Sequence, residues 1–162
     1  MYRKLFSSVL IGAGASLMLA AASASALTAS QTVEREVVVK NPDGTQTVKR
    51  QPADKVIPGE KVVYSLHYYN EQEKPAENIV LVMPIPEQIK YIDGSAERAD
   101  VKTEYSVDGG KTFATRDKLM VRLADGRLVP ARAEDITSIR WTVEKPVAPK
   151  EKGVLLFAGR LK

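Results

Sequence analysis

Hydrophobic and polar residues alternate with a period of two along much of the chain after residue 26, and polar turns separate the alternating runs. The clearest run covers residues 61–70, where Val62, Tyr64, Leu66 and Tyr68 share one face. Successive side chains of a β-strand point to opposite faces of the sheet, so this pattern predicts a strand with one inward face. No segment sustains the 3.6-residue apolar period that an amphipathic helix requires.

The first strands after residue 26 are predicted to form a hairpin. Residues 32–40 are rich in β-branched side chains and lead into the turn sequence Asn41-Pro42-Asp43-Gly44. Proline presets φ at such a turn and glycine accepts a positive φ, so residues 45–50 return as the second strand. This N-terminal hairpin either covers a sheet edge or projects as an interaction arm.

The other predicted strands are short and follow one another closely. Segment 78–85 is apolar on both faces, which predicts a strand in the middle of a sheet. The remaining predicted strands are 89–92, 103–107, 111–114, 119–123, 127–129, 138–143 and 154–161, with one helical turn at 131–135. Many short strands with irregular spacing favour an all-β fold, an antiparallel β-sandwich rather than an up-and-down barrel.

The first 26 residues have the composition of a secretory signal peptide. Arg3 and Lys4 form a basic region, an apolar stretch follows, and Ala24-Ser25-Ala26 fits the small-x-small cleavage pattern. We therefore expect a periplasmic or secreted protein without a membrane span after cleavage. The predicted organisation is a signal peptide at 1–26, a hairpin and linker at 27–55, and a sandwich at 56–162.

Composition narrows the functional classes. The formal net charge of the 162 residues is +4, and removing the signal with its two basic residues leaves +2. Basic and acidic residues are interleaved, and no basic run suggests a nucleic-acid groove. The sequence has no cysteine, so thiol catalysis, thiolate zinc sites and disulfides are excluded. The predicted mature chain has 162 − 26 = 136 residues, enough for one domain with a real core.

Residues 106–113 contain the pattern Ser106-x-Asp108-x-Gly110-x-Thr112-Phe113. The pattern resembles the Asp box of sialidases and related propellers, a repeated hairpin motif remote from catalysis. Here it occurs once, so we expect Asp108 to cap the turn through its carboxylate while Phe113 packs below. A loop that faces a glycan is the alternative.

Other candidate chemical groups are scattered. His67 is the only histidine, and without the partners of a triad or a zinc site it is predicted to be a half-exposed surface residue. The carboxylate pairs Glu134 with Asp135, and Asp54 near Glu60, could act as acid and base only if the fold brought two carboxyls together. Solvated loop charges are the simpler interpretation.

Aromatic residues divide between the two faces of the predicted strands. Tyr64, Tyr68 and Trp141 fall on inward faces and are predicted to belong to the core. Tyr69 and Tyr105 are predicted to be exposed, and a tyrosine patch could bind sugar or protein.

From Pro58-Gly59 onward, the order of motifs resembles the bacterial conserved repeat domain, the "domain of unknown function eleven" family. The motifs are Tyr64 with Asn70, the apolar run that ends at Ile85-Pro86, and Arg140-Trp141 before a short final strand. The resemblance implies an immunoglobulin-like sandwich in cell-envelope or secreted proteins and implies no activity. Where the family usually has an aspartate this chain has Met83, so a turn or cation role of that aspartate does not transfer.

The sequence thus predicts a non-enzymatic exported envelope module that acts through protein contacts, with no catalytic, cofactor-binding or metal-binding residues. The expected partner is an envelope protein or a polysaccharide, and the sequence does not identify it. A carbohydrate-binding module is the first alternative, and a hydrolase with dispersed carboxylates is the second.

Overall fold

The computed structural model describes residues 27–162, and the predicted signal peptide lies outside the described residues. Ten strands and one 3-10 turn make up the regular structure of this part of the chain, in which there is no α-helix. The elements are β1 (Leu27–Lys40), β2 (Gln46–Pro52), β3 (Lys61–Asn70), β4 (Ile79–Pro84), β5 (Ile89–Tyr91), β6 (Val101–Ser106), β7 (Met120–Arg122), β8 (Leu128–Pro130), η1 (Ala133–Asp135), β9 (Ser138–Val143) and β10 (Lys152–Leu161).

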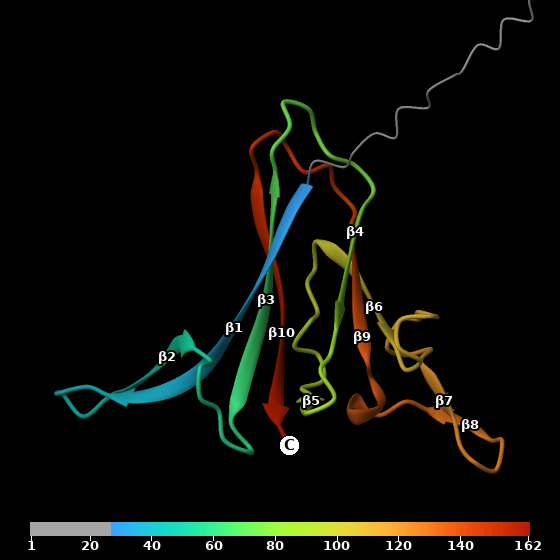
Figure 1. Cartoon of the computed structure of the whole chain (residues 1–162), viewed down its shortest axis with the longest axis horizontal. Helices are drawn as coiled ribbons and strands as arrows, with labels where there is room; N and C mark the ends of the chain where they lie inside the picture. The colour runs from blue at the N-terminus through green and yellow to red at the C-terminus, as the bar shows by residue number, and fades with distance from the viewer. Residues whose placement is uncertain (1–26) are drawn as a thin grey trace, which may run out of the picture.

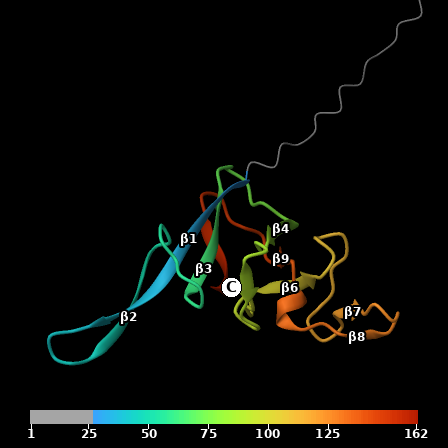
Figure 2. The ribbon, with the colours of Figure 1, turned by 60° about the horizontal axis from the view of Figure 1, so that its bottom comes forward.

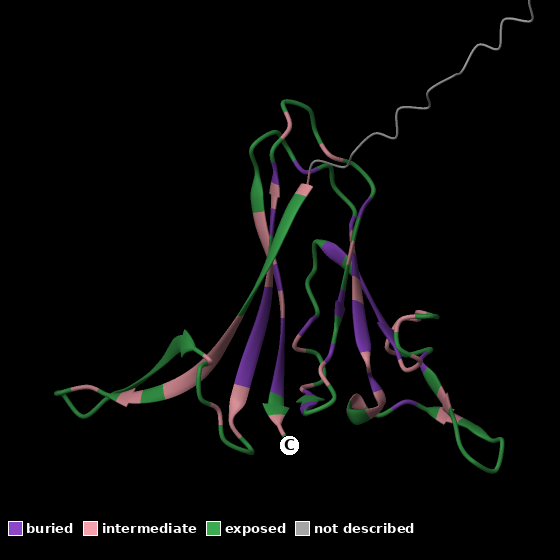
Figure 3. Ribbon diagram, viewed as in Figure 1, coloured by how far each residue is buried: buried purple, intermediate pink, exposed green. Residues whose placement is uncertain are grey.

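The strands form two larger antiparallel sheets and one hairpin. The larger sheets have the orders β2-β1-β3-β10-β5 and β4-β9-β6, and β7 pairs with β8 (Figure 1). Buried residues of both larger sheets belong to one hydrophobic cluster, as the burial colours along β3 and β9 indicate (Figure 3). The prediction of an all-β antiparallel sandwich is confirmed.

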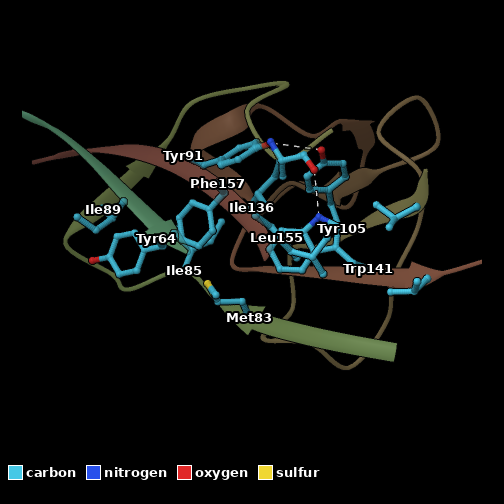
Figure 4. Packing of buried hydrophobic residues seen from close by; sticks show 14 of the residues in the cluster. Tyr64, Met83, Ile85, Ile89, Tyr91, Tyr105, Ile136, Trp141, Leu155 and Phe157 are labelled. Atoms are coloured by element: carbon cyan, nitrogen blue, oxygen red, sulfur yellow. Dashed lines mark hydrogen bonds between the residues drawn. The ribbon is translucent and has the colours of Figure 1, made fainter. Parts of the chain in front are cut away.

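Large aromatic and aliphatic side chains fill the core between the sheets (Figure 4). Tyr64 of β3 stacks on Phe157 of β10 with ring centroids 4.9 Å apart. Trp141 of β9 is fully buried, and its Nε1 donates to the carbonyl of Ala96 at 3.0 Å. Tyr68 is also buried, so the prediction of Tyr64, Tyr68 and Trp141 as core residues is confirmed.

The prediction that Tyr105 is exposed is wrong, because its relative exposure is 0%. Tyr105 lies opposite Ile139 on the inward face of β6. Its hydroxyl donates to Glu97 Oε1 at 2.5 Å and lies 3.2 Å from the Tyr91 hydroxyl. Burial, together with hydrogen bonding to Glu97, raises the pKa of Tyr105. A tyrosine of this kind can be buried only because its polar end has partners.

The prediction that segment 78–85 is a central strand is also wrong. Within residues 27–162, β4 pairs with β9 alone and forms an edge of its sheet. Val80 and Val82 point away from the core, with exposed fractions of 53% and 49%. The segment is apolar on both faces although only one of them is covered.

The N-terminal hairpin both covers an edge and projects. Leu27–Arg35 of β1 pairs with β3, whereas Glu34–Lys40 pairs with β2. The hairpin of β1 and β2 therefore runs past the end of β3 and leaves the body on the side opposite the β7–β8 hairpin, as both views show (Figures 1 and 2).

We expect Tyr105→Phe to lower the free energy of unfolding by about 1–3 kcal/mol, because Glu97 and Tyr91 lose a buried hydrogen-bond partner. Tyr69→Phe is the matched control. Tyr69 lies on the outer face of β3, so removing its hydroxyl should change stability by about 0.5 kcal/mol or less. Urea unfolding of both variants measures the difference, and equal stabilities would contradict the role of the Tyr105 hydroxyl.

Candidate interaction surface

The projecting part of the N-terminal hairpin, residues 36–50, is called the arm below. At its base, Glu36 lies 2.9 Å from the Lys61 ammonium and 3.7 Å from the Arg50 guanidinium. The hydrogen bond from Lys61 is the main cause that lowers the pKa of Glu36 below its ordinary value. This carboxylate joins the arm to Lys61, the first residue of β3, and pairs with Arg50 of β2.

The outer edge of β2 presents backbone groups that have no partner in the described part of the chain. The amide of Asn41 donates to Thr45 O at 2.8 Å, and the amide of Ala53 donates to Val33 O at 3.1 Å. Alternate residues of an antiparallel strand direct their N–H and C=O groups to opposite sides. The odd-numbered residues of 45–53 therefore face β1, and Gln46, Val48 and Arg50 direct their backbone groups outward.

Two valines lie side by side on one face of the arm. Val38 and Val48 are cross-strand partners, with exposed fractions of 64% and 62%. On the same face, the next pair toward the base is Glu36 with Arg50. A two-stranded hairpin standing alone in water is marginally stable, so this exposed pair is well placed for contact with another surface.

A second open edge belongs to β4. The amide of Ile85 donates to Thr137 O at 2.8 Å, so odd-numbered residues of this strand face β9. Val80 and Val82 then direct their N–H and C=O groups outward, and Pro84 has no N–H to offer. Beside this edge, the start of β1 and the start of β4 border a surface hollow lined by Leu27, Ala29, Glu77, Asn78, Ile79, Val80 and Leu81.

A separate hollow contains the histidine singled out from the sequence. Its lining residues are Thr28, Ala29, Ser30, His67, Tyr68, Tyr69, Lys152 and Gly153. His67 is exposed and its Nε2 lies 3.1 Å from Thr32 Oγ1. The Lys152 ammonium lies 5.4 Å from the Tyr69 ring centroid. Within residues 27–162, no carboxylate pairs with the His67 ring, so these groups do not assemble a charge-relay triad.

Three of the four carboxylates considered as acid and base are held by cations or by the backbone, and the fourth, Asp54, is exposed. Glu134 lies 3.3 Å from the Lys90 ammonium, and Asp135 lies 3.2 Å from the Arg132 guanidinium. Hydrogen bonding from Arg132 lowers the pKa of Asp135. Glu60 accepts a hydrogen bond from the amide of Ile57 at 3.0 Å and lies 3.7 Å from Arg35.

Asp108 caps its turn through its carboxylate. The Ser106 hydroxyl and the Thr112 hydroxyl donate to it at 2.6 Å each, and the amides of Lys111 and Thr112 donate at 3.1 and 3.0 Å. These hydrogen bonds, led by that from Ser106, hold the pKa of Asp108 far below its usual range. The predicted capping role of Asp108 is confirmed.

Phe113 anchors the turn to the neighbouring sheet. The Arg140 guanidinium lies 4.3 Å from its ring centroid and donates to Glu104 Oε2 at 2.8 Å. Burial acts to raise the pKa of Glu104, but hydrogen bonds from Lys102 and Arg140 outweigh it, and the pKa is lowered. The turn is thereby fixed onto β6 and β9.

No protein-family model, curated protein or solved structure matches the chain. No helix in the described range is long and apolar enough to cross a membrane. Residues 27–162 contain no group of three or more histidine, aspartate or glutamate side chains that could hold a metal ion.

Sequence reasoning did not identify the four exposed valines of the arm and of β4. The signal was present at residues 37–39, where three consecutive valines must occupy both faces of a strand. When apolar residues lie on both faces of an edge hairpin, the residue on one face stays uncovered. Here that residue is Val38.

We expect Asp108→Asn to be less stable than the wild type near neutral pH. A lowered folded-state pKa gives stability that is complete above the unfolded-state pKa of about 3.9 and is lost as pH falls toward the folded-state value. The stability difference between wild type and variant should therefore shrink below about pH 4. Urea unfolding over this pH range measures it, with Asp54→Asn, in an exposed loop, as the control. A difference that does not vary with pH would refute the role of the ionised carboxylate.

Proposed function

We propose that this protein is an exported, non-enzymatic module of the cell envelope or secreted space that acts through protein contacts. The observation that carries this proposal is the arm, where the outward backbone groups of Gln46, Val48 and Arg50 lie beside the exposed Val38–Val48 pair. Such an edge offers both hydrogen-bonding groups and apolar contact area to an extended segment of a partner.

Strand addition is the mode of binding that this edge suits. A partner strand placed along β2 gains backbone hydrogen bonds at every second residue and continues the five-stranded sheet. The side chain of Val48 supplies an apolar contact on one face of the added strand. The non-enzymatic part of the proposal is supported by the ion pairs that hold Glu134 and Asp135.

An immunoglobulin-like fold of the conserved repeat type belongs to the same proposal. Two residues of the resemblance have structural roles that support it. Asn70 is fully buried at the end of β3, and its side-chain amide donates to Val147 O at 2.9 Å. Trp141, on the strand with the Arg-Trp motif, is a central core residue. Asn70 and Trp141 each connect segments that are far apart in the sequence, as is expected of residues that define a domain family.

A carbohydrate-binding module is the second candidate. The hollow beside His67 favours it, because the Tyr69 ring lies beside hydroxyl groups of Thr28 and Ser30 and the Lys152 ammonium. A glycan array that includes peptidoglycan fragments tests this candidate. Tyr69→Ala should remove any binding that uses this hollow, and an array without hits would eliminate it.

Two matched proline variants test the protein-contact proposal. Val48 and Val82 are both exposed valines with outward N–H groups, on β2 and β4 respectively. Proline at either position removes only the outward N–H and is tolerated at a strand edge. We expect Val48→Pro to abolish capture of envelope proteins in a cross-linking pull-down, and Val82→Pro to leave it unchanged.

The other results of this experiment separate the proposed function from its proposed site. If Val82→Pro alone loses capture, protein contact is retained as the function but the arm is not its site. If both variants capture as the wild type does, protein contact is retained but neither edge is its site. If the wild type captures nothing, the proposed function is wrong.

A further inference from the structure

We propose that the strand added to β2 is β2 of a second copy of this chain, so that two arms pair antiparallel about a two-fold axis at Val48. This inference rests on the proposed function, because it uses the same edge, and it specifies the partner. Closed two-fold dimers are the commonest symmetric assemblies, and they require a self-complementary surface.

The backbone of β2 is self-complementary at Val48. Both the N–H and the C=O of Val48 are directed outward, so two copies exchange a pair of hydrogen bonds across the axis. In this register, Gln46 lies opposite Arg50 of the second copy, and the outward groups of both residues are also paired. The overlap covers residues 45–51 of each copy, which is nearly all of β2.

The side chains fit the same register. Val38 and Val48 of the two copies form one row of four valines across the joined sheets. Arg50, whose charge is paired with Glu36, lies opposite a neutral glutamine of the second copy. On the other face, Lys49 lies opposite Thr47 of the second copy, so no two like charges are directly opposed.

Other two-fold registers are less favourable. An axis at Arg50 or at Lys49 places two like charges directly opposite each other, which is destabilising. An axis at Gln46 shortens the overlap. An axis at Thr47 opposes Val48 to Gln46 and brings Arg50 against Gly44 in the turn. The register centred on Val48 alone joins the valines and separates the charges.

The other sheet edges differ from that of β2. β5 and residues 92–98 cover the outer edge of β10, where the Ile92 amide donates to Ala158 O at 2.9 Å and Arg98 donates to Val154 O at 2.5 Å. The β4 edge offers the outward N–H groups of Val80 and Val82 before Pro84, whereas the β2 edge offers those of Gln46, Val48 and Arg50 before Pro52. An interface of one strand pair and four valines lies at the small end of specific interfaces, so the dimer should be reversible.

Light scattering of the exported protein over a range of concentrations is the first test. We expect the mass of wild type and of Val82→Pro to rise from monomer to dimer, and that of Val48→Pro to remain that of a monomer. A wild type that stays monomeric throughout, or a Val48→Pro that still dimerises, overturns the proposal.

Single-cysteine variants test the register, since the chain has no cysteine of its own. At the axis, two copies of Val48→Cys have Cα atoms about 5.5 Å apart, within reach of a short thiol cross-linker. Pro42→Cys, at the exposed tip of the same arm, is level with Gly44 and so lies four residues along the strand from the axis in each copy, which places it about 26 Å or more from its mate. We expect a covalent dimer with Val48→Cys and none with Pro42→Cys or with Val82→Cys. Comparable cross-linking of the three variants overturns the two-fold pairing.

The two proposals can fail separately. If the wild type is monomeric and Val48→Pro still abolishes capture of other envelope proteins, the two-fold dimer is wrong and the protein-contact function is retained. If no mass change and no capture are found, both are wrong.

Discussion

The need to satisfy backbone hydrogen bonds determines which sheet edges of this molecule are covered by other segments and which are left exposed. Each strand has two edges, and a buried edge without partners would be destabilising. Residues 92–98 and β5 cover β10, the amide and carbonyl of Tyr105 bond to Ala114 at the outer side of β6, and the Asn70 side chain donates to the loop carbonyls of Val147 and Ala148. Among the described strands, the start of β1, all of β2, and β4 are edges that no other strand covers.

The body and the arm are stabilised by different interactions. Between the sheets, the rings of Trp141, Tyr105 and Phe157 are fully buried and their polar atoms have partners, so the body has both apolar burial and satisfied hydrogen bonds. The arm has its own ladder and the Glu36 ion pairs at its base. The arm has no hydrophobic core of its own. Contact with a partner therefore stabilises it.

Local alternation predicted the strands that lie in the core. The bounds 61–70 and 138–143 agree with β3 and β9, because each has apolar side chains at every second position toward the other sheet. The start of β1, residues 27–31, was missed because Thr28 and Ser30 are exposed polar residues in the part of β1 that β2 does not cover, which gives no apolar signal. The burial of Tyr105 and the edge position of β4 depend on which strands become neighbours, and no local pattern contains that information.

The same limit explains why the candidate interaction surface could be anticipated only in part. The turn at 41–44 predicted that a hairpin exists, but its projection depends on β3 beginning at Lys61, so that Glu36–Lys40 extends past its neighbour. The hydrogen bonds from the amides of Asn41 and Ala53 then fix which residues of β2 face β1. Because backbone direction alternates along a strand, the N–H and C=O of Val48 face outward. An exposed β-branched residue whose backbone groups also point outward has the two properties that an added strand requires.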